Sequence, residues 1–325
     1  MSSDFRFASI VSDSSFSNSH LFDASVTMGV MWPEQMKQLT FILFSLIASV
    51  SNAQDWHGIE IPASTPEGTS WQLQSVSDDF NYVAKPTKKP KQFTDKWNDS
   101  FINDWLGPGN TEFNPGHSYV TNGHLGIHAS RKPDTKKVYA GVISSNDSFS
   151  YPLYVEVKAK LSGLVLASNV WMLSEDSTQE IDILEAYGSD RKGQEWYRER
   201  LHLSHHVFIR KPFQDYQPTD DGSWFTNGTV WANDFHRVGV LWRDPWHLEY
   251  YVDGKLVRTV SGRDKIDPKN FTDGSGLSKS MKIIINTEDQ DWRKDAGITP
   301  TDVELADPKK QIMWLDWIRV YKLEK

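Results

Sequence analysis

The chain has 325 residues, of which 38% are hydrophobic and 24% charged, a composition typical of a soluble globular protein with a sizeable core. The net charge of −8 argues against a nucleic-acid partner, because no basic stripe is present to neutralise phosphates. The absence of cysteine excludes disulfides, thiolate nucleophiles and cysteine-based zinc sites. The 14 Trp, 11 Tyr and 16 Phe favour a sandwich core or flat platforms for sugar rings.

The N-terminal part of the chain has the pattern of an export signal. Met36-Lys37-Gln38 is followed by an apolar run over residues 39–50 and by small residues at 51–53. A positive start, a short apolar stretch and small residues at the cleavage point are typical of a secretory signal peptide, and the run is short for a membrane span. We therefore expect residues 36–53 to be a signal peptide, and an extracellular or periplasmic protein without a membrane anchor. Residues 1–35 are interpreted as a misassigned start or a disordered leader.

Residues 54–325 are predicted to form a single all-β domain. Residues 54–75 read as an extended arm, and residues 154–161 alternate apolar with charged residues, which indicates a strand. Asn122-Gly123 and Asp253-Gly254 are two-residue hairpin turn signals. Further strands are expected at 237–242, 281–286 and 312–323. Many short strands with regular turns predict a β-sandwich or jelly roll of two antiparallel sheets.

Three carboxylates occupy the six residues Glu180–Glu185, in an otherwise β-branched and apolar run. In a regular strand Glu185 would point away from Glu180 and Asp182, because side chains alternate between faces. One extra residue at Ile183-Leu184, a β-bulge, would bring all three acids onto one surface. The carboxyl groups of the two glutamates could then approach the roughly 5–5.5 Å separation of retaining glycosidases.

Two other interpretations of these acids are weaker. A solvated acidic edge strand is disfavoured by Gln179, Tyr187 and the apolar residues between the acids. Calcium binding fits poorly, because calcium loops are turn-like and contain glycine. Paired carboxylates on a rigid strand suit glycosidic bond cleavage, in which one attacks the anomeric carbon and the other protonates the leaving oxygen. Asp182, between them, should help a neighbouring glutamate to hold a proton.

A later strand carries polar side chains on one face. By its period of two, residues 201–210 place His202, Ser204, His206, Phe208 and Arg210 together, opposite Leu201, Leu203, His205, Val207 and Ile209. Zinc binding is disfavoured, because His202 and His206 lie too far apart along a strand to chelate one ion readily.

The motif Glu180–Glu185 resembles the bulged E-x-D-x-x-E signature of glycoside hydrolase family 16, which includes laminarinases, lichenases, carrageenases and agarases. Flanking segments are similar to the β-agarases of this family, and they span residues 171–179, 185–188, 202–218, 286–293 and 316–321. The resemblance covers roughly residue 55 to the last residue. It implies a β-jelly roll with an open cleft on the concave sheet, and retaining endo-hydrolysis of the β-1,4 linkages of agarose, between D-galactose and 3,6-anhydro-L-galactose.

The resemblance also implies roles for individual residues. By their places in the motif, Glu180 is the nucleophile, Glu185 the acid/base and Asp182 the supporting acid. Trp171 and Trp105 resemble platforms under the sugar, with core packing as the alternative for each. The remaining implied sugar contacts are His206, Arg210 and Glu288.

A structural calcium ion is a further implication of the resemblance. Family members often hold one on the convex side, and Asp316, Gly123 and Asp79 would correspond to its ligands. A salt bridge or a solvated position is the alternative for Asp316.

Competing functions remain open at this point. The expected partner is agarose or a related red-algal galactan, and the protein is expected to be a monomer. A porphyranase, a κ-carrageenase or a β-glucanase is the alternative within catalysis. A sulfated substrate would require basic residues in the cleft, and Arg198, Arg210 and Lys211 leave that open. A non-catalytic carbohydrate-binding jelly roll is disfavoured, because a binding module needs neither glutamate.

Overall fold

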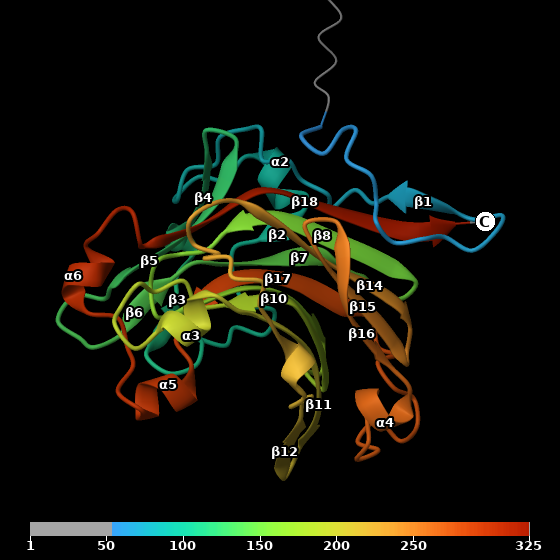
Figure 1. Cartoon of the computed structure of the whole chain (residues 1–325). Helices are drawn as coiled ribbons and strands as arrows, with labels where there is room; N and C mark the ends of the chain where they lie inside the picture. The colour runs from blue at the N-terminus through green and yellow to red at the C-terminus, as the bar shows by residue number, and fades with distance from the viewer. Residues whose placement is uncertain (1–53, 325) are drawn as a thin grey trace, which may run out of the picture. The chain divides into compact units, whose positions relative to one another are not determined.

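The computed structural model describes residues 54–324, so the predicted leader (1–35) and signal peptide (36–53) lie outside the described residues. The described residues form two stacked sheets (Figure 1). The first sheet has the strand order β16 (Lys255–Ser261), β15 (His247–Val252), β14 (His236–Asp244), β8 (Leu153–Lys160), β18 (Ile312–Glu324), β5 (His124–Arg131), β6 (Val138–Ala140) and β3 (Thr111–Phe113), with β1 (Ser70–Leu73) on β18 and β4 (Ser118–Thr121) on β5.

The second sheet carries the predicted acidic motif. Its order is β12 (Phe213–Tyr216), β11 (Leu201–Arg210), β10 (Gln179–Ala186), β9 (Ala167–Ser174), β17 (Met281–Glu288), β7 (Val142–Phe149) and β2 (Trp97–Asn98), with β13 (Trp224–Phe225) on β11. All strand pairs are antiparallel except β3 with β6. The predicted all-β jelly roll of two antiparallel sheets is therefore confirmed.

Helices are short and lie between strands. They are α2 (Lys91–Thr94), α3 (Glu195–Arg198), α4 (Arg263–Ile266), α5 (Asp291–Asp295) and α6 (Asp302–Leu305), with 3₁₀ turns η1 (Pro115–His117) and η2 (Asp221–Ser223). Within residues 54–324, no helix has the length and hydrophobicity needed to cross a bilayer.

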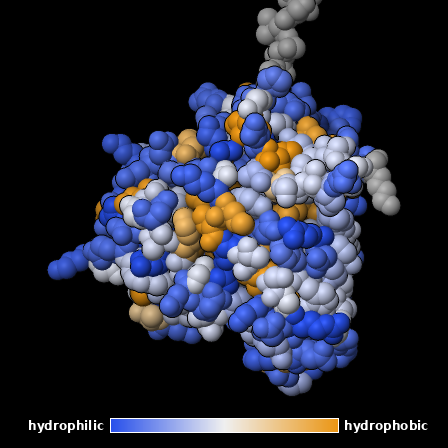
Figure 2. All heavy atoms as spheres, turned by 45° about the vertical axis from the view of Figure 1, so that its right-hand side comes forward, coloured by the Kyte–Doolittle hydropathy of each residue, from blue (hydrophilic) through white to orange (hydrophobic). Residues whose placement is uncertain are grey.

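One hydrophobic core joins the two sheets. Val155 and Val157 of β8 belong to the same buried cluster as Ile181 of β10 and Ile283 of β17. Burying these apolar side chains stabilises the sandwich, because each fully buried aliphatic residue contributes roughly 1.5–3 kcal/mol. Most of the surface in view in Figure 2 is hydrophilic, and hydrophobic residues reach it only in small areas.

Both predicted hairpin turns are confirmed. Asn122 and Gly123 join β4 to β5 with φ values of 51° and 75°, and Asp253 and Gly254 join β15 to β16 with φ values of 48° and 79°. Two successive positive φ angles define the type I′ turn, whose twist matches that of the flanking strands.

The outer face of the first sheet differs from the alternation seen in the sequence. Val155 and Val157 face the core as predicted, but Glu156, expected on a charged face, is fully buried. The side chain of Arg319 donates a hydrogen bond from Nε to Glu156 Oε2 at 2.6 Å, and its two terminal nitrogens donate to the carbonyls of Ile59 and Glu60 at 2.7 and 2.9 Å. Residues of the predicted arm therefore cover this face of the sheet. Arg319, a member of the buried ion pair, holds the arm in place through its hydrogen bonds to the backbone.

We expect Arg319→Met to lower the free energy of unfolding by about 3–5 kcal/mol, because the buried Glu156 carboxylate loses its hydrogen-bonded cation and keeps only Arg237, 3.6 Å away. Urea unfolding measures this. Lys322→Met on the same strand is the matched control, and its effect should stay within about 0.5 kcal/mol. Adding Glu156→Leu to Arg319→Met should recover part of the loss, and equal stability of Arg319→Met and the wild type would contradict this interpretation.

Candidate active site

A β-bulge lies in β10, at the position predicted from the sequence. Against β9, Asp182 pairs with Trp171 and Leu184 with Val170, so one residue of β10 is extra. Against β11, the same shift lies between Asp182 and Glu185. As a result all three acids of the motif face one cleft, and the apolar residues Ile181, Ile183 and Leu184 enter the core.

The cleft has a volume of about 1350 Å³ and is lined almost entirely by the second sheet and its loops. One end is lined by residues 101–108, which follow β2, and the other by residues 213–219 of β12 and the loop after it. Because β2 and β12 are the opposite edges of this sheet, the cleft crosses its strands. Its volume exceeds the roughly 300–1,000 Å³ of small-molecule pockets, which suits an extended polymer.

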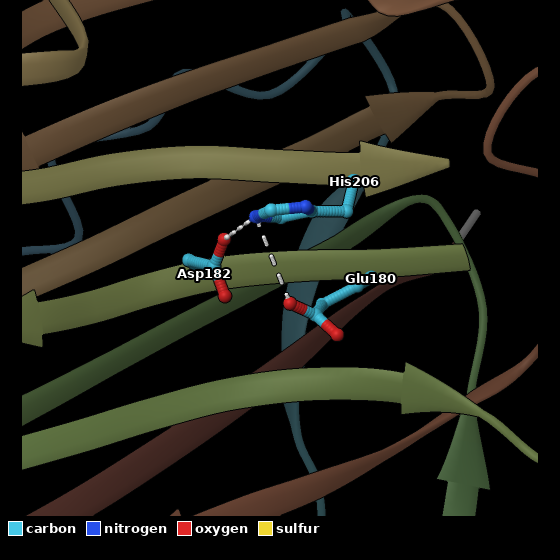
Figure 3. Close-up of side chains that lie close together, drawn as sticks. All are labelled: Glu180, Asp182 and His206. Atoms are coloured by element: carbon cyan, nitrogen blue, oxygen red, sulfur yellow. Dashed lines mark ion pairs between the residues drawn. The ribbon is translucent and has the colours of Figure 1, made fainter. Parts of the chain in front are cut away.

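Glu180 and Asp182 both lie beside Nε2 of the His206 imidazole, and the three side chains point toward one another (Figure 3). His206 Nε2 lies 3.6 Å from Asp182 Oδ2 and 3.9 Å from Glu180 Oε1. On the other side of the ring, Nδ1 donates to Asp215 Oδ1 at 2.9 Å. Burial alone would lower the pKa of His206, but the hydrogen bond to Asp215 and the negative charges of Glu180 and Asp182 raise it to about 10. The imidazole is therefore protonated at neutral pH.

The Glu180 and Asp182 carboxyls are more difficult to ionise than ordinary ones. Burial raises the pKa of Glu180, and the negative charge of Asp182 raises it further. Burial likewise raises the pKa of Asp182, against the opposing effect of His206. Adjacent carboxylates in a dry site cannot all carry a charge cheaply, so this pair retains one proton.

The same three side chains are close enough to bracket a metal ion, since one donor atom from each lies within 4.8 Å of the others. A protonated imidazole has no free lone pair for a metal, however. A metal ion here would have to displace the proton on Nε2, which in this structure forms ion pairs with Glu180 and Asp182.

Glu185 has a different environment. Tyr187 donates its hydroxyl to Glu185 Oε1 at 2.6 Å, and His202 Nδ1 lies 2.7 Å from Oε2. Burial would raise the pKa of Glu185, but the charge and hydrogen bond of His202 and the hydrogen bond of Tyr187 outweigh it, so the pKa is lowered. The two glutamates of one strand thus differ in how readily they ionise.

Glu288 is the last residue of β17 and faces the same cleft. It accepts hydrogen bonds from Asn286 Nδ2 at 2.8 Å and from Gln290 Nε2 at 2.9 Å. Burial and the negative charge of Glu185 raise the pKa of Glu288 to about 8, against these hydrogen bonds. A largely protonated carboxyl at neutral pH can both donate and accept a hydrogen bond.

The residues predicted to contact sugar all line the cleft: Trp105, Trp171, His206, Arg210 and Glu288. Trp171 is 8% exposed and donates from Nε1 to Asn286 Oδ1 at 2.7 Å, which fixes its ring. Trp105 is 44% exposed and packs on Phe101 with ring centres 5.2 Å apart. Trp105 therefore presents open aromatic surface, whereas Trp171 is also part of the packed floor.

Several lining residues were not predicted. Asp215, Trp224 and Phe101 have no local signal, since each reaches the cleft from a loop or short strand far from the motif in sequence. The period of residues 201–210 did place His202 correctly on the cleft side.

The predicted calcium ligands come from three segments that lie close together, since Gly123 is beside Asn81 and the next residue, His124, is beside Asp316. Asp316 occupies a register shift of β18, and its carboxylate pairs with Lys158 Nζ at 2.7 Å and lies 3.8 Å from His124 Nε2. Asp79 accepts a hydrogen bond from the backbone of Asn81 at 3.3 Å, and Gly123 forms the β4–β5 turn. The Lys158 ammonium group occupies one oxygen of Asp316, so a calcium ion would have to share this carboxylate with Lys158 or displace it. Calcium binding stays a prediction.

Comparisons with known proteins agree with this geometry. Residues 71–323 match the family model described as "Beta-porphyranase A-D, GH16 domain". The chain is 59% identical over 291 residues to β-agarase AgaA of Microbulbifer thermotolerans, covering 88% of this chain and 67% of the relative. It is 26% identical over 269 residues to β-porphyranase E of Zobellia galactanivorans, covering 79% and 90%.

Solved structures give the same result. The structure of β-agarase B from Zobellia galactanivorans superposes with a TM-score of 0.81 at 49% identity, covering 83% of this chain and 99% of that one. An inactivated mutant of β-agarase B in complex with agaro-octaose aligns with the same values.

The raised pKa of Glu288 makes stability depend on pH. In the folded protein this carboxyl keeps its proton up to a pKa of about 8, whereas its ordinary pKa is 4.5. Its contribution to stability is therefore complete below pH 4.5 and is lost as the pH rises to about 8. We expect Glu288→Gln to gain stability over the wild type across that interval, by an amount on the order of a few kcal/mol. Unfolding measured between pH 4.5 and 9 checks this, and a pH-independent difference between the two proteins would contradict it.

Proposed function

We propose a function from the premise that this chain belongs to glycoside hydrolase family 16, in the group that contains β-agarases and β-porphyranases. The protein is an endo-acting, retaining β-agarase that cleaves the β-1,4 linkages of agarose, between D-galactose and 3,6-anhydro-L-galactose. The observation that supports this most strongly is the bulged strand, which directs Glu180, Asp182 and Glu185 into one open cleft. A cleft that crosses the strands from one edge of the sheet to the other suits attack within a long chain.

The reaction proceeds in two balanced steps. In the first, a Glu180 oxygen attacks the anomeric carbon, the bond from that carbon to the leaving oxygen breaks, and Glu185 gives its proton to that oxygen, a step that requires protonated Glu185 although its pKa is lowered. In the second, a water molecule attacks the same carbon, its proton passes to Glu185, and the ester bond to Glu180 breaks. Two displacements at one carbon retain its configuration.

Glu180 must be ionised to attack, although burial beside Asp182 raises its pKa. We assign the proton that the pair retains to Asp182. With this assignment the His206 imidazolium, 3.9 Å from Glu180 Oε1, stabilises the negative charge of the attacking carboxylate. Asp215 in turn holds His206 in its charged form.

The charge of the cleft favours a neutral polymer over a sulfated one. Among the described residues that line it, Arg210 is the one lysine or arginine, and six are acidic: Asp176, Glu180, Asp182, Glu185, Asp215 and Glu288. The Arg210 guanidinium already stacks on Phe208 at 4.3 Å and donates to the carbonyl of Ser177. Sulfate groups would meet mostly like charge, which costs binding energy.

Porphyran is the second candidate substrate, because the matched family model carries the porphyranase name. Sequence identity favours agarose, at 59% to the Microbulbifer agarase against 26% to β-porphyranase E. Export accompanies this function, since agarose is a gel-forming polymer that cells meet outside, and residues 36–53 have the signal-peptide pattern. The structural calcium ion and the monomeric state belong to the same proposal.

We expect the wild type to release reducing sugar from agarose, with far lower rates on porphyran, κ-carrageenan and laminarin. Glu180→Gln should lose several orders of magnitude in kcat, because an amide cannot form the glycosyl ester. Glu175→Gln is the matched control, since this exposed acid lies outside the cleft and should retain full activity. Proton NMR of the first product should show the β-anomer. Undiminished activity of Glu180→Gln would remove it as nucleophile, and a first-formed α-anomer would exclude retention.

We expect Trp105→Ala to raise KM about 3- to 10-fold for long agaro-oligosaccharides and to leave kcat nearly unchanged, because an exposed aromatic platform stacks on a sugar away from the reacting bond. Leu106→Ala removes an exposed apolar neighbour that does not line the cleft, and serves as the control. Steady-state kinetics would contradict the platform role if both variants matched the wild type.

A further inference from the structure

The carboxyl of Glu185 is held at both oxygens by groups from two different elements. Tyr187, just after β10, donates to Oε1 at 2.6 Å, and His202 of β11 contacts Oε2 through Nδ1 at 2.7 Å. Among the described residues, the Tyr187 hydroxyl and His202 Nδ1 each form a side-chain hydrogen bond with Glu185 and with no other side chain. A carboxyl group with a hydrogen bond at each oxygen is held in a single orientation, whereas the carboxyl groups of most surface glutamates rotate freely.

The orientation of the Tyr187 ring is fixed by the residues that pack against it. Its ring is 1% exposed, and the guanidinium of Arg293 lies 4.4 Å from the ring centre. Arg293 is fully buried, stacks also on Tyr197 at 4.7 Å, and donates a hydrogen bond to the side-chain oxygen Oε1 of Gln194. Burial raises the pKa of Tyr187 well above its usual value, so the hydroxyl keeps its proton and acts as donor. The cation under the ring makes that hydroxyl a better donor.

His202 is fixed by stacking. Its ring lies on Trp224 of β13, with centres 4.3 Å apart and an interplanar angle of 21°. The side chain is 5% exposed, so water does not compete for Nδ1. The imidazole thus approaches Oε2 from a single direction, set by β11 and β13.

The charged groups around Glu185 come from every element packed against it. Asp182 on β10 and Glu288 on β17 oppose its ionisation, whereas His202 and His206 on β11 favour it. The Arg293 cation of α5 acts from behind Tyr187. The charge and hydrogen bond of His202, together with the hydrogen bond of Tyr187, turn this balance toward the carboxylate.

We propose that Tyr187 and His202 are positioning residues for the acid/base step: they fix the orientation of the Glu185 carboxyl and stabilise the carboxylate that forms when its proton moves to the leaving sugar oxygen. This rests on the proposed function. The charge that develops on Glu185 in the first step meets two hydrogen-bond contacts already in place, so no reorganisation is needed. In the second step the same contacts present the carboxylate as the base that takes the proton of water, and the proton returns to its starting position.

The test compares Tyr187→Phe, which removes only the hydroxyl, with His202→Leu and with His202→Asn, whose amide nitrogen can replace Nδ1 as a donor. Tyr197→Phe is the matched control, because it removes a hydroxyl from the same aromatic group without touching Glu185. The readouts are kcat and kcat/KM against pH on a soluble agaro-oligosaccharide.

We expect kcat to fall about 10- to 100-fold in Tyr187→Phe and His202→Leu, as misplacement of a reacting group does. The alkaline limb of kcat/KM should move to higher pH, because without these contacts Glu185 holds its proton more tightly. His202→Asn should recover part of both effects, and Tyr197→Phe should match the wild type. A purely structural role would lower activity without moving the limb.

A second measurement separates this proposal from the function it rests on. Ionisation of Glu185 is followed by NMR of ¹³C-labelled glutamate carboxyls, with Glu185→Gln to assign the signal. An upward shift of its midpoint in Tyr187→Phe and His202→Leu supports the proposal even if the wild type does not act on agarose, a result that would defeat only the proposed function. Unmoved midpoints and coincident pH profiles would overturn the positioning role.

Discussion

One extra residue in β10 is the constraint on which the site depends. A strand alternates its side chains, so residues 180 and 185 of an unbroken ladder belong to opposite faces. The register shift between Asp182 and Glu185 is absorbed against both neighbours, β9 and β11, and it leaves apolar residues on the core side throughout. The same shift therefore satisfies packing beneath the sheet and gathers acids above it. A bulge leaves one residue unpaired in the ladder, and here the packed core on one side of the strand fixes its position.

The second determinant is how the cleft distributes charge. Four largely buried carboxyl groups, those of Glu180, Asp182, Glu185 and Glu288, share a partly dry space beside His202 and His206, and burial makes it costly for all four to ionise. The consequence is differentiation among chemically identical side chains: Glu180 and Asp182 share a proton, Glu288 keeps one, and Glu185 is drawn toward its carboxylate by Tyr187 and His202. Environment, and not residue type, separates the roles of two glutamates on one strand.

Local pattern was sufficient to predict much of this from sequence. The alternation of residue types predicted which side chains of β8 and β11 share a face. The Asn-Gly and Asp-Gly pairs predicted two hairpin turns, and the spacing of the acids around apolar residues predicted the bulge. The features that could not be predicted depend on contacts between residues far apart in the sequence. Glu156 was expected on a charged face, and its burial follows from Arg319, 163 residues away. Asp215, the partner that charges His206, likewise has no signature, because its role arises only when β12 folds against β11.

The position of β18 has a consequence for assembly. This most C-terminal of the described strands lies between β8 and β5, in the interior of its sheet, and Arg319 within it binds the carbonyl of Ile59 across 260 residues of sequence. The arm and the other strands of this sheet are synthesised before β18, the strand that must pair between them. The first sheet therefore closes late, after nearly all of the described strands have been synthesised.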